Sequence, residues 1–561
     1  MRRWSETAER VTATSRTSEK VRLLAEYLRT LTPAELPTAV TFFTGRPFPE
    51  RDPRVLGLGW AAIDEVVQAE ADAAPGALGR AYDRSSDLGR AVFDVLDESR
   101  RRPSGELPTL TDVRDTFAAI AAASGAEAKA VPFRTLLWRS DPLVAKYLVK
   151  VISGDMRIGL REGNLEAAIA AAFGQALPAV QWAGMLTGDL GHTAELARDD
   201  RLGEAELTLF RPLKSMLASP AADVAEVVAR LGTPVWVEDK YDGIRAQLHR
   251  LGGETRLYSR DLHDVSGQFP EVIAAAGELA WSGILDGELL AWRDGTALPF
   301  QRLQGRLGRK RPAVSVLVAT PVIFVAFDLL ASGGRDTTPE PLLRIPLRER
   351  RARLEQLGLA GRAGFGLSHR ETATSAAELD ERFAAARARG NEGLMVKDPE
   401  SGYSPGRRGF GWLKLKRPLA TLDCVVVGVE VGHGKRHGVL SDYTFAVRDD
   451  RPDAVHPLAT IGKAYSGLTD AELADMTRWF TDHTISLHGR YRVVEPTIVV
   501  EVAFDVIQRS SRHASGYALR FPRIARLRDD KGPEEVDRLS TVAALEARLA
   551  AGAHVAVETS A

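Results

Sequence analysis

The sequence contains a single cysteine, Cys424, among 561 residues. One thiol excludes an intrachain disulfide and any zinc module that needs two or more thiolates. A chain so poor in cysteine fits a reducing compartment such as the cytosol. An excess of charge of one sign is also missing, because 74 Lys and Arg residues oppose 75 Asp and Glu residues. A uniformly basic coat for nucleic acid is therefore excluded, whereas separate basic patches are not.

Long hydrophobic runs are absent as well. The most apolar stretch, Val314 to Phe327, is about fourteen residues long and is interrupted by Thr320 and Pro321. It is too short to span a bilayer, and we predict two buried strands there, VSVLVA and VIFVAF. The N-terminal residues have no apolar core of the length that a signal peptide needs. We therefore expect a soluble cytoplasmic protein with no membrane association.

The spacing of apolar residues changes along the chain, which predicts a multidomain protein. Residues 1–17 are polar and aperiodic and are expected to form a flexible leader. From 18 to 205 apolar residues recur at helical spacing, and several helices end at glycine, which predicts an all-α domain. From 206 to 416 short strand candidates are mixed with helices, which predicts an α+β domain. From 417 to 561 five short strands and one helix suit a small β-barrel of the OB type, followed by a tail.

The α+β block opens with a segment of alternating charge, Val237-Glu238-Asp239-Lys240-Tyr241-Asp242-Gly243-Ile244-Arg245. Strand periodicity would place Glu238, Lys240 and Asp242 on one face. A lysine between carboxylates on a strand is most often part of a solvated face with ion pairs. The four fixed positions of K-x-D-G-x-R make this segment more specific than a generic charged strand.

Further charged motifs follow in a fixed order. They are Ser259-Arg260-Asp261, Asp286-Gly287-Glu288, Phe327-Asp328, Glu392-Gly393-Leu394-Met395-Val396-Lys397, Trp412-Leu413-Lys414-Leu415-Lys416, Arg520-Phe521-Pro522-Arg523 and Arg528-Asp529-Asp530-Lys531. Alternation along a strand places Lys414 and Lys416 on one face. Taken in this order and spacing, the chain closely resembles the covalent nucleotidyltransferase superfamily, and specifically the ATP-dependent DNA ligases.

The resemblance covers almost the whole chain and implies a function for each block. The helical block, with its Gly154–Leu160 segment, looks like the DNA-binding domain of the family. The α+β block, entered through Arg211–Leu217, looks like the adenylation domain, and the last block looks like the OB-fold domain. The implied enzyme is an ATP-dependent DNA ligase that seals nicks in duplex DNA during replication, repair or recombination.

The resemblance assigns the adenylate chemistry to Lys240, which would attack the α-phosphorus of ATP and carry AMP. A free lysine side chain has a pKa of about 10.4, and neighbouring cations would favour the neutral amine that attacks. By the same resemblance, Glu238 would read the adenine and Phe327 would stack on it. Arg245 and Arg260 would contact the ribose or a phosphate.

The same resemblance supplies the ligands for metal and phosphate. Glu288 and Glu392 would help to bind a divalent metal or the sugar hydroxyls, and Arg408, Lys414 and Lys416 would hold the α-phosphate. Mg²⁺ is the expected metal because carboxylate and phosphate oxygens are hard ligands.

Taken singly, several of these residues allow other interpretations. Phe327 lies in an apolar strand and can be a core residue. Arg260 and Arg408 can be surface ion-pairing arginines. Asp286 can be a turn residue before its glycine. Arg407 precedes Arg408 directly, and the sequence leaves open which of the two contacts the nucleotide.

Contacts to nicked double-stranded DNA are expected from three basic patches. Residues 302–311 and 407–417 each contain five basic and no acidic residues, and residues 505–531 contain seven basic against three acidic residues. Each patch can also be ordinary solvated surface. Together they suit a clamp that neutralises phosphates along a duplex. The barrel would close over the site so that Lys531 and the motif around Arg528 orient pyrophosphate, with a hinge near 417–421.

Other assignments remain to be weighed against this one. NAD-dependent DNA ligases use a zinc finger, which one cysteine cannot build. RNA-capping guanylyltransferases share K-x-D-G and R-x-D-K but would not need a large helical domain, and an RNA ligase is disfavoured in the same way. A catalytically idle nick-binding factor should lack the nucleophile. We expect a monomer associated with the nucleoid, and a sliding clamp is a plausible partner, although no docking motif for one is evident.

Overall fold

The computed structural model describes residues 1–50, 52, 54–99, 103–389, 391, 393–406, 408–416, 420–432, 438–550 and 557–558. The chain divides into two units. The first comprises residues 1–214 with 261–263, and the second comprises residues 215–260 with 264–561.

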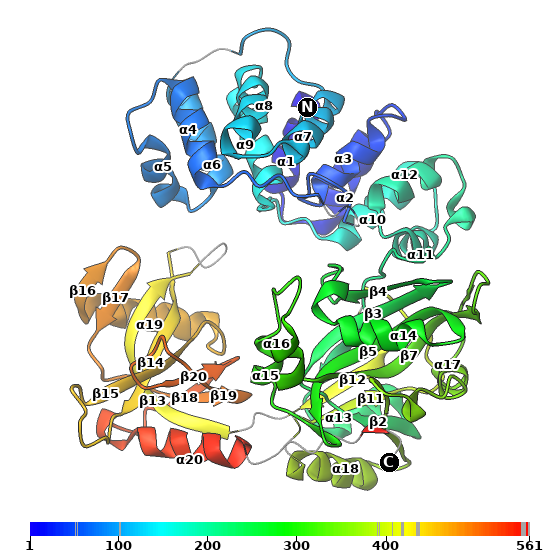
Figure 1. Cartoon of the computed structure of the whole chain (residues 1–561). Helices are drawn as coiled ribbons and strands as arrows, with labels where there is room; N and C mark the ends of the chain where they lie inside the picture. Colours follow the sequence, from blue (N-terminus) through cyan, green and yellow to red (C-terminus); the bar gives the residue numbers. More distant parts are fainter. Residues whose placement is uncertain are drawn as a thin grey trace. The chain divides into compact units, whose positions relative to one another are not determined.

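The first unit is helical throughout, as the apolar spacing predicted (Figure 1). Helices α9 and α10 end where the sequence places a glycine, because Gly154 and Gly174 adopt left-handed φ angles of 71° and 69°. The helices are α1 (Arg2–Ala13), α2 (Thr17–Leu28), α3 (Leu36–Phe43), α4 (Trp60–Ala71), α5 (Ala77–Ser85), α6 (Leu88–Glu98), α7 (Leu110–Ala122), α8 (Ala126–Trp138), α9 (Pro142–Ser153), α10 (Glu162–Phe173), α11 (Leu177–Thr187) and α12 (Leu190–Arg198).

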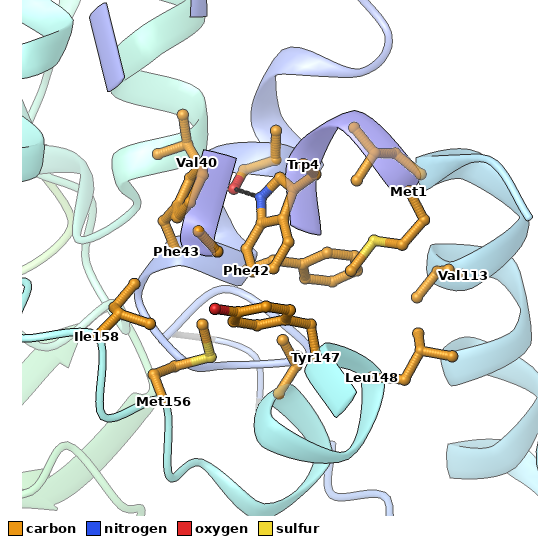
Figure 2. Packing of buried hydrophobic residues seen from close by; sticks show 14 of the residues in the cluster. Met1, Trp4, Val40, Phe42, Phe43, Val113, Tyr147, Leu148, Met156 and Ile158 are labelled. Atoms are coloured by element: carbon orange, nitrogen blue, oxygen red, sulfur yellow. Dashed lines mark hydrogen bonds between the residues drawn. The ribbon is translucent and has the colours of Figure 1, made fainter. Parts of the chain in front are cut away.

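The N-terminal segment belongs to this unit, and the prediction of a flexible leader over residues 1–17 is wrong. Helix α1 places Trp4, Ala8 and Val11 on its inner face, where all three are fully buried. The indole of Trp4 stacks on Phe43 at 4.5 Å between ring centroids and donates a hydrogen bond to the carbonyl oxygen of Ala39 at 3.0 Å (Figure 2). Three apolar residues at helical spacing are enough to dock a short helix whose other positions are mostly polar or charged.

The second unit contains two sheets built from residues 215–416 and a short C-terminal strand (Figure 1). One sheet has the strand order β1-β12-β11-β2-β10, and the other has the order β22-β9-β7-β5-β3-β4. The strands of the first are β1 (Leu217–Ala221), β2 (Val235–Asp239), β10 (Arg370–Ala373), β11 (Gly393–Lys397) and β12 (Arg408–Lys416). Those of the second are β3 (Ile244–Leu251), β4 (Glu254–Ser259), β5 (Trp281–Arg293), β7 (Val322–Gly334), β9 (Phe365–Ser368) and β22 (Val557–Glu558).

Helices are interspersed with these strands, in agreement with the predicted α+β pattern. They are α13 (Val224–Leu231), α14 (Pro270–Gly277), α15 (Phe300–Gln304), α16 (Val314–Ala319), α17 (Leu347–Glu355) and α18 (Ala376–Ala388). Gly252 and Gly253 form the turn that joins β3 to β4 as an antiparallel hairpin.

Of the two strands predicted in the most apolar stretch, only the second is present. VIFVAF begins β7, which is buried between β5 and β9. VSVLVA forms helix α16, and its Val314 and Val318 side chains are 74% and 69% exposed. The prediction was wrong because a six-residue apolar run is compatible with either structure, and periodicity alone does not separate them.

The C-terminal part of the second unit is rich in β-structure, as predicted. Strand β13 pairs with β14, β17 and β18, and the apolar side chains of these strands pack together around Phe445 and Phe504. The elements are β13 (Ala420–Val431), β14 (Leu440–Arg448), β15 (Leu458–Ala464), α19 (Asp470–Asp482), β16 (Thr484–His488), β17 (Tyr491–Val494), β18 (Val499–Phe504), β19 (Val506–Arg509), β20 (Tyr517–Arg520), β21 (Arg523–Leu527) and α20 (Leu539–Ala550).

Candidate active site

The two carboxylates that precede Lys240 are buried and paired. Strand β2 lies between β11 and β10, so its last residues are covered on both sides by neighbouring strands. The carboxylate of Glu238 accepts a hydrogen bond from Nζ of Lys397 at 2.7 Å, and that of Asp239 accepts one from Nη2 of Arg389 at 2.6 Å. Both negative charges next to Lys240 are thus compensated by cations from other elements.

Lys240 lies in the turn that carries the chain from one sheet to the other. Its backbone N–H donates a hydrogen bond to the carbonyl oxygen of Gly393 at 3.0 Å. Strand β2 ends before it and β3 begins at Ile244, so the alternation expected through Asp242 does not extend across this turn. Gly243 is required there, because a Cβ atom would lie 2.5 Å from the carbonyl oxygen of Leu289.

Arg245 is held by a buried network of hydrogen bonds. Its Nε and Nη2 donate to the carboxylate of Asp286 at 3.1 and 2.7 Å, and its Nη1 donates to the carbonyl oxygen of Met216 at 2.6 Å. The hydroxyl of Tyr403 donates to the same carboxylate at 2.5 Å and accepts a hydrogen bond from the backbone N–H of Met216 at 3.1 Å. Asp286 is fully buried inside β5, which rules out the alternative of a turn residue.

Glu288 lies opposite Arg245 in the pairing of β3 with β5. Burial raises the pKa of Glu288 to about 8, although the charges of Arg245 and Lys240 oppose this rise. Glu392, the second predicted metal ligand, lies outside the described residues. Among the residues that the structure does describe, no group of three or more His, Cys, Asp or Glu side chains is arranged to hold a metal ion.

The ring of Phe327 lies where β7 is irregular. Asp286 pairs with Asp328 and Gly287 with Ala326, so Phe327 is the extra residue of a β-bulge. A bulge changes the direction of a side chain relative to the regular pleat, and bulges are frequent beside active sites. Phe327 is 8% exposed, and its ring centroid is 6.1 Å from that of Trp412 at an interplanar angle of 74°.

Positive side chains gather around Lys414. Burial lowers the pKa of the Lys414 ammonium, and the positive charges of Lys416, Arg408, Lys240 and Arg260 lower it further. Arg260 and Arg408 are exposed at the ends of their strands, and Arg407 lies outside the described residues. Such a concentration of cations suits a ligand with several negative oxygens.

The predicted alternation in β12 is confirmed. Leu413 and Leu415 are fully buried, whereas Lys414 and Lys416 retain exposure. Lys414 thus lies close enough to Lys416, Lys240, Arg260 and Arg408 for their positive charges to act on it.

Family models match three segments of the chain. Residues 1–170 match the N terminus of DNA ligases, residues 215–416 match the ATP-dependent DNA ligase domain, and residues 436–531 match the C-terminal region of ATP-dependent DNA ligases. A "Probable DNA ligase" of Koribacter versatilis is 46% identical over 95% of this chain and 94% of its own length. The chain belongs to the ATP-dependent DNA ligase family.

Other relatives of this ligase carry similar names. A "Probable DNA ligase" of Opitutus terrae is 46% identical over 98% of the chain, which spans 62% of that longer protein. A "DNA ligase" of Methanopyrus kandleri is 36% identical over 96% of the chain and 97% of its own length. The predicted resemblance is therefore confirmed, and among the protein families considered it selects the ATP-dependent DNA ligases.

A solved structure supports the fold of the ligase as a whole. The structure named "Pmar-Lig_PreS3" aligns with a TM-score of 0.59, covering 94% of this chain and 99% of that chain at 15% identity. At that identity the likeness concerns the fold, and it agrees with a helical domain, a mixed α/β domain and a β-rich C-terminal domain. Among the described residues of the ligase, no helix combines the length and apolar character that crossing a membrane requires.

The cations of the last motif are paired within the C-terminal part of the ligase. The guanidinium of Arg528 donates to both carboxylate oxygens of Asp423 at 2.7 and 2.9 Å, and Nζ of Lys531 donates to the same carboxylate at 2.6 Å. Asp530 is a second partner of Arg528 at 2.8 Å. Lys416 forms an ion pair with Asp505.

Several residues of the site were missed by sequence reasoning or given no role. Tyr403 lies in no motif that was singled out, and Arg389 lies near the end of a charged helix. Trp412 and Lys397 are part of quoted motifs, so the signal was available although neither received a function.

Proposed function

We propose that this ligase seals nicks in duplex DNA through an adenylate carried on Lys240. The observation that carries the proposal is the gathering of Lys240, Lys416, Arg408 and Arg260 around Lys414, in a chain that belongs to the ATP-dependent DNA ligases. An amine nucleophile beside a set of phosphate-binding cations is the arrangement that phosphoryl transfer to lysine requires.

In the first step, Nζ of Lys240 attacks the α-phosphorus of ATP. A P–N bond forms, the bond from the α-phosphorus to the β-phosphate oxygen breaks, and the amine loses its proton as pyrophosphate leaves. Lys414 and Arg408 neutralise the α-phosphate oxygens, on which charge accumulates in the transition state. Positioning and charge compensation supply most of the rate enhancement in phosphoryl transfer.

The adenosine of ATP would be recognised by residues of both sheets. Phe327 stacks on the adenine, and Glu238 accepts a hydrogen bond from it. Arg245, held in place by Asp286, and Arg260 contact the ribose or a phosphate. The positions of these residues support the proposed roles. Phe327 lies at a bulge, and the charged groups of Arg245 and Lys397 both lie within 5.3 Å of the centroid of the Phe327 ring.

A divalent metal, expected to be Mg²⁺, would be held by Glu288 and Glu392 together with phosphate oxygens. The carboxylate of Glu288 is a hard oxygen ligand of the kind that Mg²⁺ prefers. Its pKa of about 8 means that cation binding must displace a proton from it. When bound, the metal would supply charge neutralisation on the phosphates.

The remaining two steps act on DNA. AMP passes from Lys240 to the 5′-phosphate at a nick, so a P–O bond replaces the P–N bond. The 3′-hydroxyl then attacks that 5′-phosphate, and AMP leaves as the phosphodiester forms. The helical domain and the basic patches would hold the duplex by its phosphates, independently of sequence. The predicted domain boundaries at 205 and 416, the monomeric state and the sliding-clamp partner stay predictions.

The covalent step provides a direct test. The purified protein is incubated with Mg²⁺ and α-labelled ATP, GTP or NAD, and covalent label is measured on a denaturing gel. We expect label from ATP alone, none in Lys240→Ala, and normal label in the matched control Lys463→Ala, whose lysine pairs with Glu430 in the C-terminal part. Label that persists in Lys240→Ala would overturn the assignment of the nucleophile.

Sealing of defined nicks tests the later steps. A duplex with one nick between DNA ends should be sealed by the wild type with ATP and Mg²⁺. A nick whose 3′-hydroxyl and 5′-phosphate strands are both RNA should be sealed much more slowly. Preference for the RNA nick would contradict the proposed substrate, even if the label on Lys240 were observed.

A further inference from the structure

Lys397 is a buried lysine to which the steps above assign no role. It is the last residue of β11, its side chain is 2% exposed, and its Nζ donates to Oε2 of Glu238 at 2.7 Å. In the sheet it lies opposite Trp236, two positions before Glu238 in β2, so both side chains project from the same face. Lys397 and Glu238 therefore form a diagonal cross-strand ion pair inside the protein.

A buried ion pair of this kind is costly. Burial lowers the pKa of the Lys397 ammonium, and the charge of Glu238 opposes that effect. Removing two charges from water costs several kcal/mol per ion before their attraction repays it. An apolar pair of similar volume would hold β2 against β11 equally well, so the strand pairing alone does not explain why charges are used.

The position of the pair suggests a use for the charges. Nζ of Lys397 lies 4.8 Å from the ring centroid of Phe327 and 4.5 Å from that of Trp412. The ammonium thus contacts both the carboxylate and the ring that we assign to the adenine. The hydrogen bond from Lys397 goes to Oε2 of Glu238.

The hydrogen-bonding capacity of Glu238 decides which base it can recognise. A carboxylate accepts hydrogen bonds and donates none. Adenine presents an amino group at position 6, which donates, and guanine or hypoxanthine presents a carbonyl oxygen there, which accepts. A carboxylate held in place by Lys397 would bond to the amino group and face the carbonyl oxygen with repulsion.

We propose that Lys397 is a positioning residue that sets the preference for ATP over 6-oxopurine nucleotides by holding the Glu238 carboxylate in place as an oriented acceptor. This inference rests on the proposed contact between Glu238 and adenine. Without the ammonium, the Glu238 carboxylate loses the hydrogen-bond donor that fixes its position, so it is no longer held against the group at position 6 of the base. Loss of Lys397 should therefore weaken the use of ATP and improve the use of ITP.

The test compares α-labelled ATP with α-labelled ITP in the covalent labelling of Lys240. The two nucleotides differ at position 6 without the additional amino group of guanine. A site built to bond a donor rejects an analogue that lacks it by about 100-fold or more. We expect the wild-type ratio of initial rates, ATP over ITP, to reach that order. In Lys397→Met it should fall at least about tenfold, and Lys397→Arg, which keeps the cation, should stay close to the wild type.

A double-mutant cycle with Glu238→Gln distinguishes an effect of Lys397 that acts through Glu238 from a general loss of structure at the site. The glutamine amide both donates and accepts, so Glu238→Gln should lower the ATP-over-ITP ratio by itself. If Lys397 acts only through Glu238, then Lys397→Met should not change the ratio further in the Glu238→Gln background. The double variant also contains no unpaired buried charge from this pair, so its ATP-over-ITP ratio can still be measured if Lys397→Met alone folds poorly.

Each outcome bears on one of the two proposals. If Glu238→Gln leaves the ratio unchanged, the contact between Glu238 and adenine is wrong, and the role of Lys397 fails with it. If Glu238→Gln lowers the ratio but Lys397→Met reduces the ATP and ITP rates in parallel, the pair is structural and only the role of Lys397 is overturned. A lowered ratio in both single variants, with no further loss in the double variant, supports the role.

Discussion

Arg245 and Asp286 are joined by two hydrogen bonds, at 3.1 and 2.7 Å, between neighbouring strands of one sheet. The carboxylate is fully buried, and the guanidinium is 16% exposed. The same carboxylate accepts a hydrogen bond from Tyr403. The arginine proposed to contact the nucleotide is thus fixed before any ligand binds, which reduces the ordering cost of binding.

Replacing Asp286 with alanine should damage both stability and the first step. It would leave the guanidinium of Arg245 buried without a counter-charge, at a cost of about 3–5 kcal/mol in the free energy of unfolding. The rate of covalent labelling by ATP should fall because Arg245 loses its orientation. Denaturant unfolding and the initial rate of labelling measure the two effects.

Tyr403→Phe is the matched control for this variant. It removes the hydrogen bond to Asp286 and the one from the backbone N–H of Met216 but keeps the ion pair, so the expected cost is about 1–3 kcal/mol. Labelling should stay much closer to the wild type than in Asp286→Ala. Equal losses in the two variants would show that the ion pair has no special role in holding Arg245.

The segments that carry Lys240 and the lysines of β12 could be recognised in the sequence because each motif is contiguous, and the roles proposed for these residues stay predictions. The placement of Lys414 and Lys416 on one face could be predicted from the two-residue period of a strand alone. The structure confirms that they alternate with buried leucines. The motif order then identified the family. The contact of Tyr403 with Asp286 could not be predicted, since it joins residues 117 positions apart through the packing of two sheets.

The two wrong predictions about the fold, a flexible leader and a buried strand at Val314, have a common physical cause. The segments at Trp4 and at Val314 are short, and a short segment is defined by its tertiary contacts more than by its own pattern. Trp4 docks a charged helix into an aromatic cluster, whereas Val314 begins an exposed helix where composition suggested a buried strand. Neither neighbourhood can be inferred from local composition.

His249 should make the stability of the second unit depend on pH. It lies fully buried in β3 with its ring 5.0 Å from that of Tyr258, and burial lowers the pKa of His249 to about 3. Below the unfolded value of about 6.5, the unfolded chain binds a proton that the folded chain does not. Stability is therefore lost as the pH falls from about 6.5 towards 3, by about 1.4 kcal/mol per pH unit.

The substitution His249→Gln should remove this contribution. Between pH 6.5 and 5 the variant should lose less stability than the wild type, although it is less stable at pH 8 because the buried ring is lost. Denaturant unfolding at several pH values measures the difference, and the exposed His488→Gln serves as the control. Parallel pH profiles for the wild type and His249→Gln would contradict the prediction.

The basic segment of residues 302–311 should contribute to DNA binding through its last three residues. Arg309, Lys310 and Arg311 are exposed, whereas Arg306 is fully buried and paired with Glu271. Replacing the three exposed residues with alanine should weaken binding to a nicked duplex. The slope of log affinity against log salt should fall by about 0.9 for each phosphate that the variant no longer neutralises.

Fluorescence anisotropy with a labelled nicked duplex at several KCl concentrations measures this slope. Arg256→Ala provides a control, because Arg256 is also exposed in the second unit but is paired with Glu254 and Asp264. A triple variant with weaker binding and an unchanged salt slope would indicate that the segment acts without touching phosphates.

The docking of helix α1 predicts that the first residues of the chain stabilise the helical unit. Trp4 is fully buried against Phe43, and its ring centroid lies 5.6 Å from that of Tyr147. Trp4→Ala should therefore lower the free energy of unfolding of this unit by about 3–5 kcal/mol. The exposed neighbour in Arg3→Ala should cost less than about 0.5 kcal/mol.

Denaturant unfolding of the two full-length variants, followed by circular dichroism at a helix-sensitive wavelength, provides the measurement. Because the residues proposed to bind ATP lie in the other unit, covalent labelling of Lys240 by ATP should stay near the wild-type rate in Trp4→Ala under native conditions. Sealing of nicked DNA should decline as the helical unit unfolds. If Trp4→Ala unfolds at the same denaturant concentration as Arg3→Ala, the segment contributes nothing to the stability of the unit, and the expectation of a flexible leader would be restored.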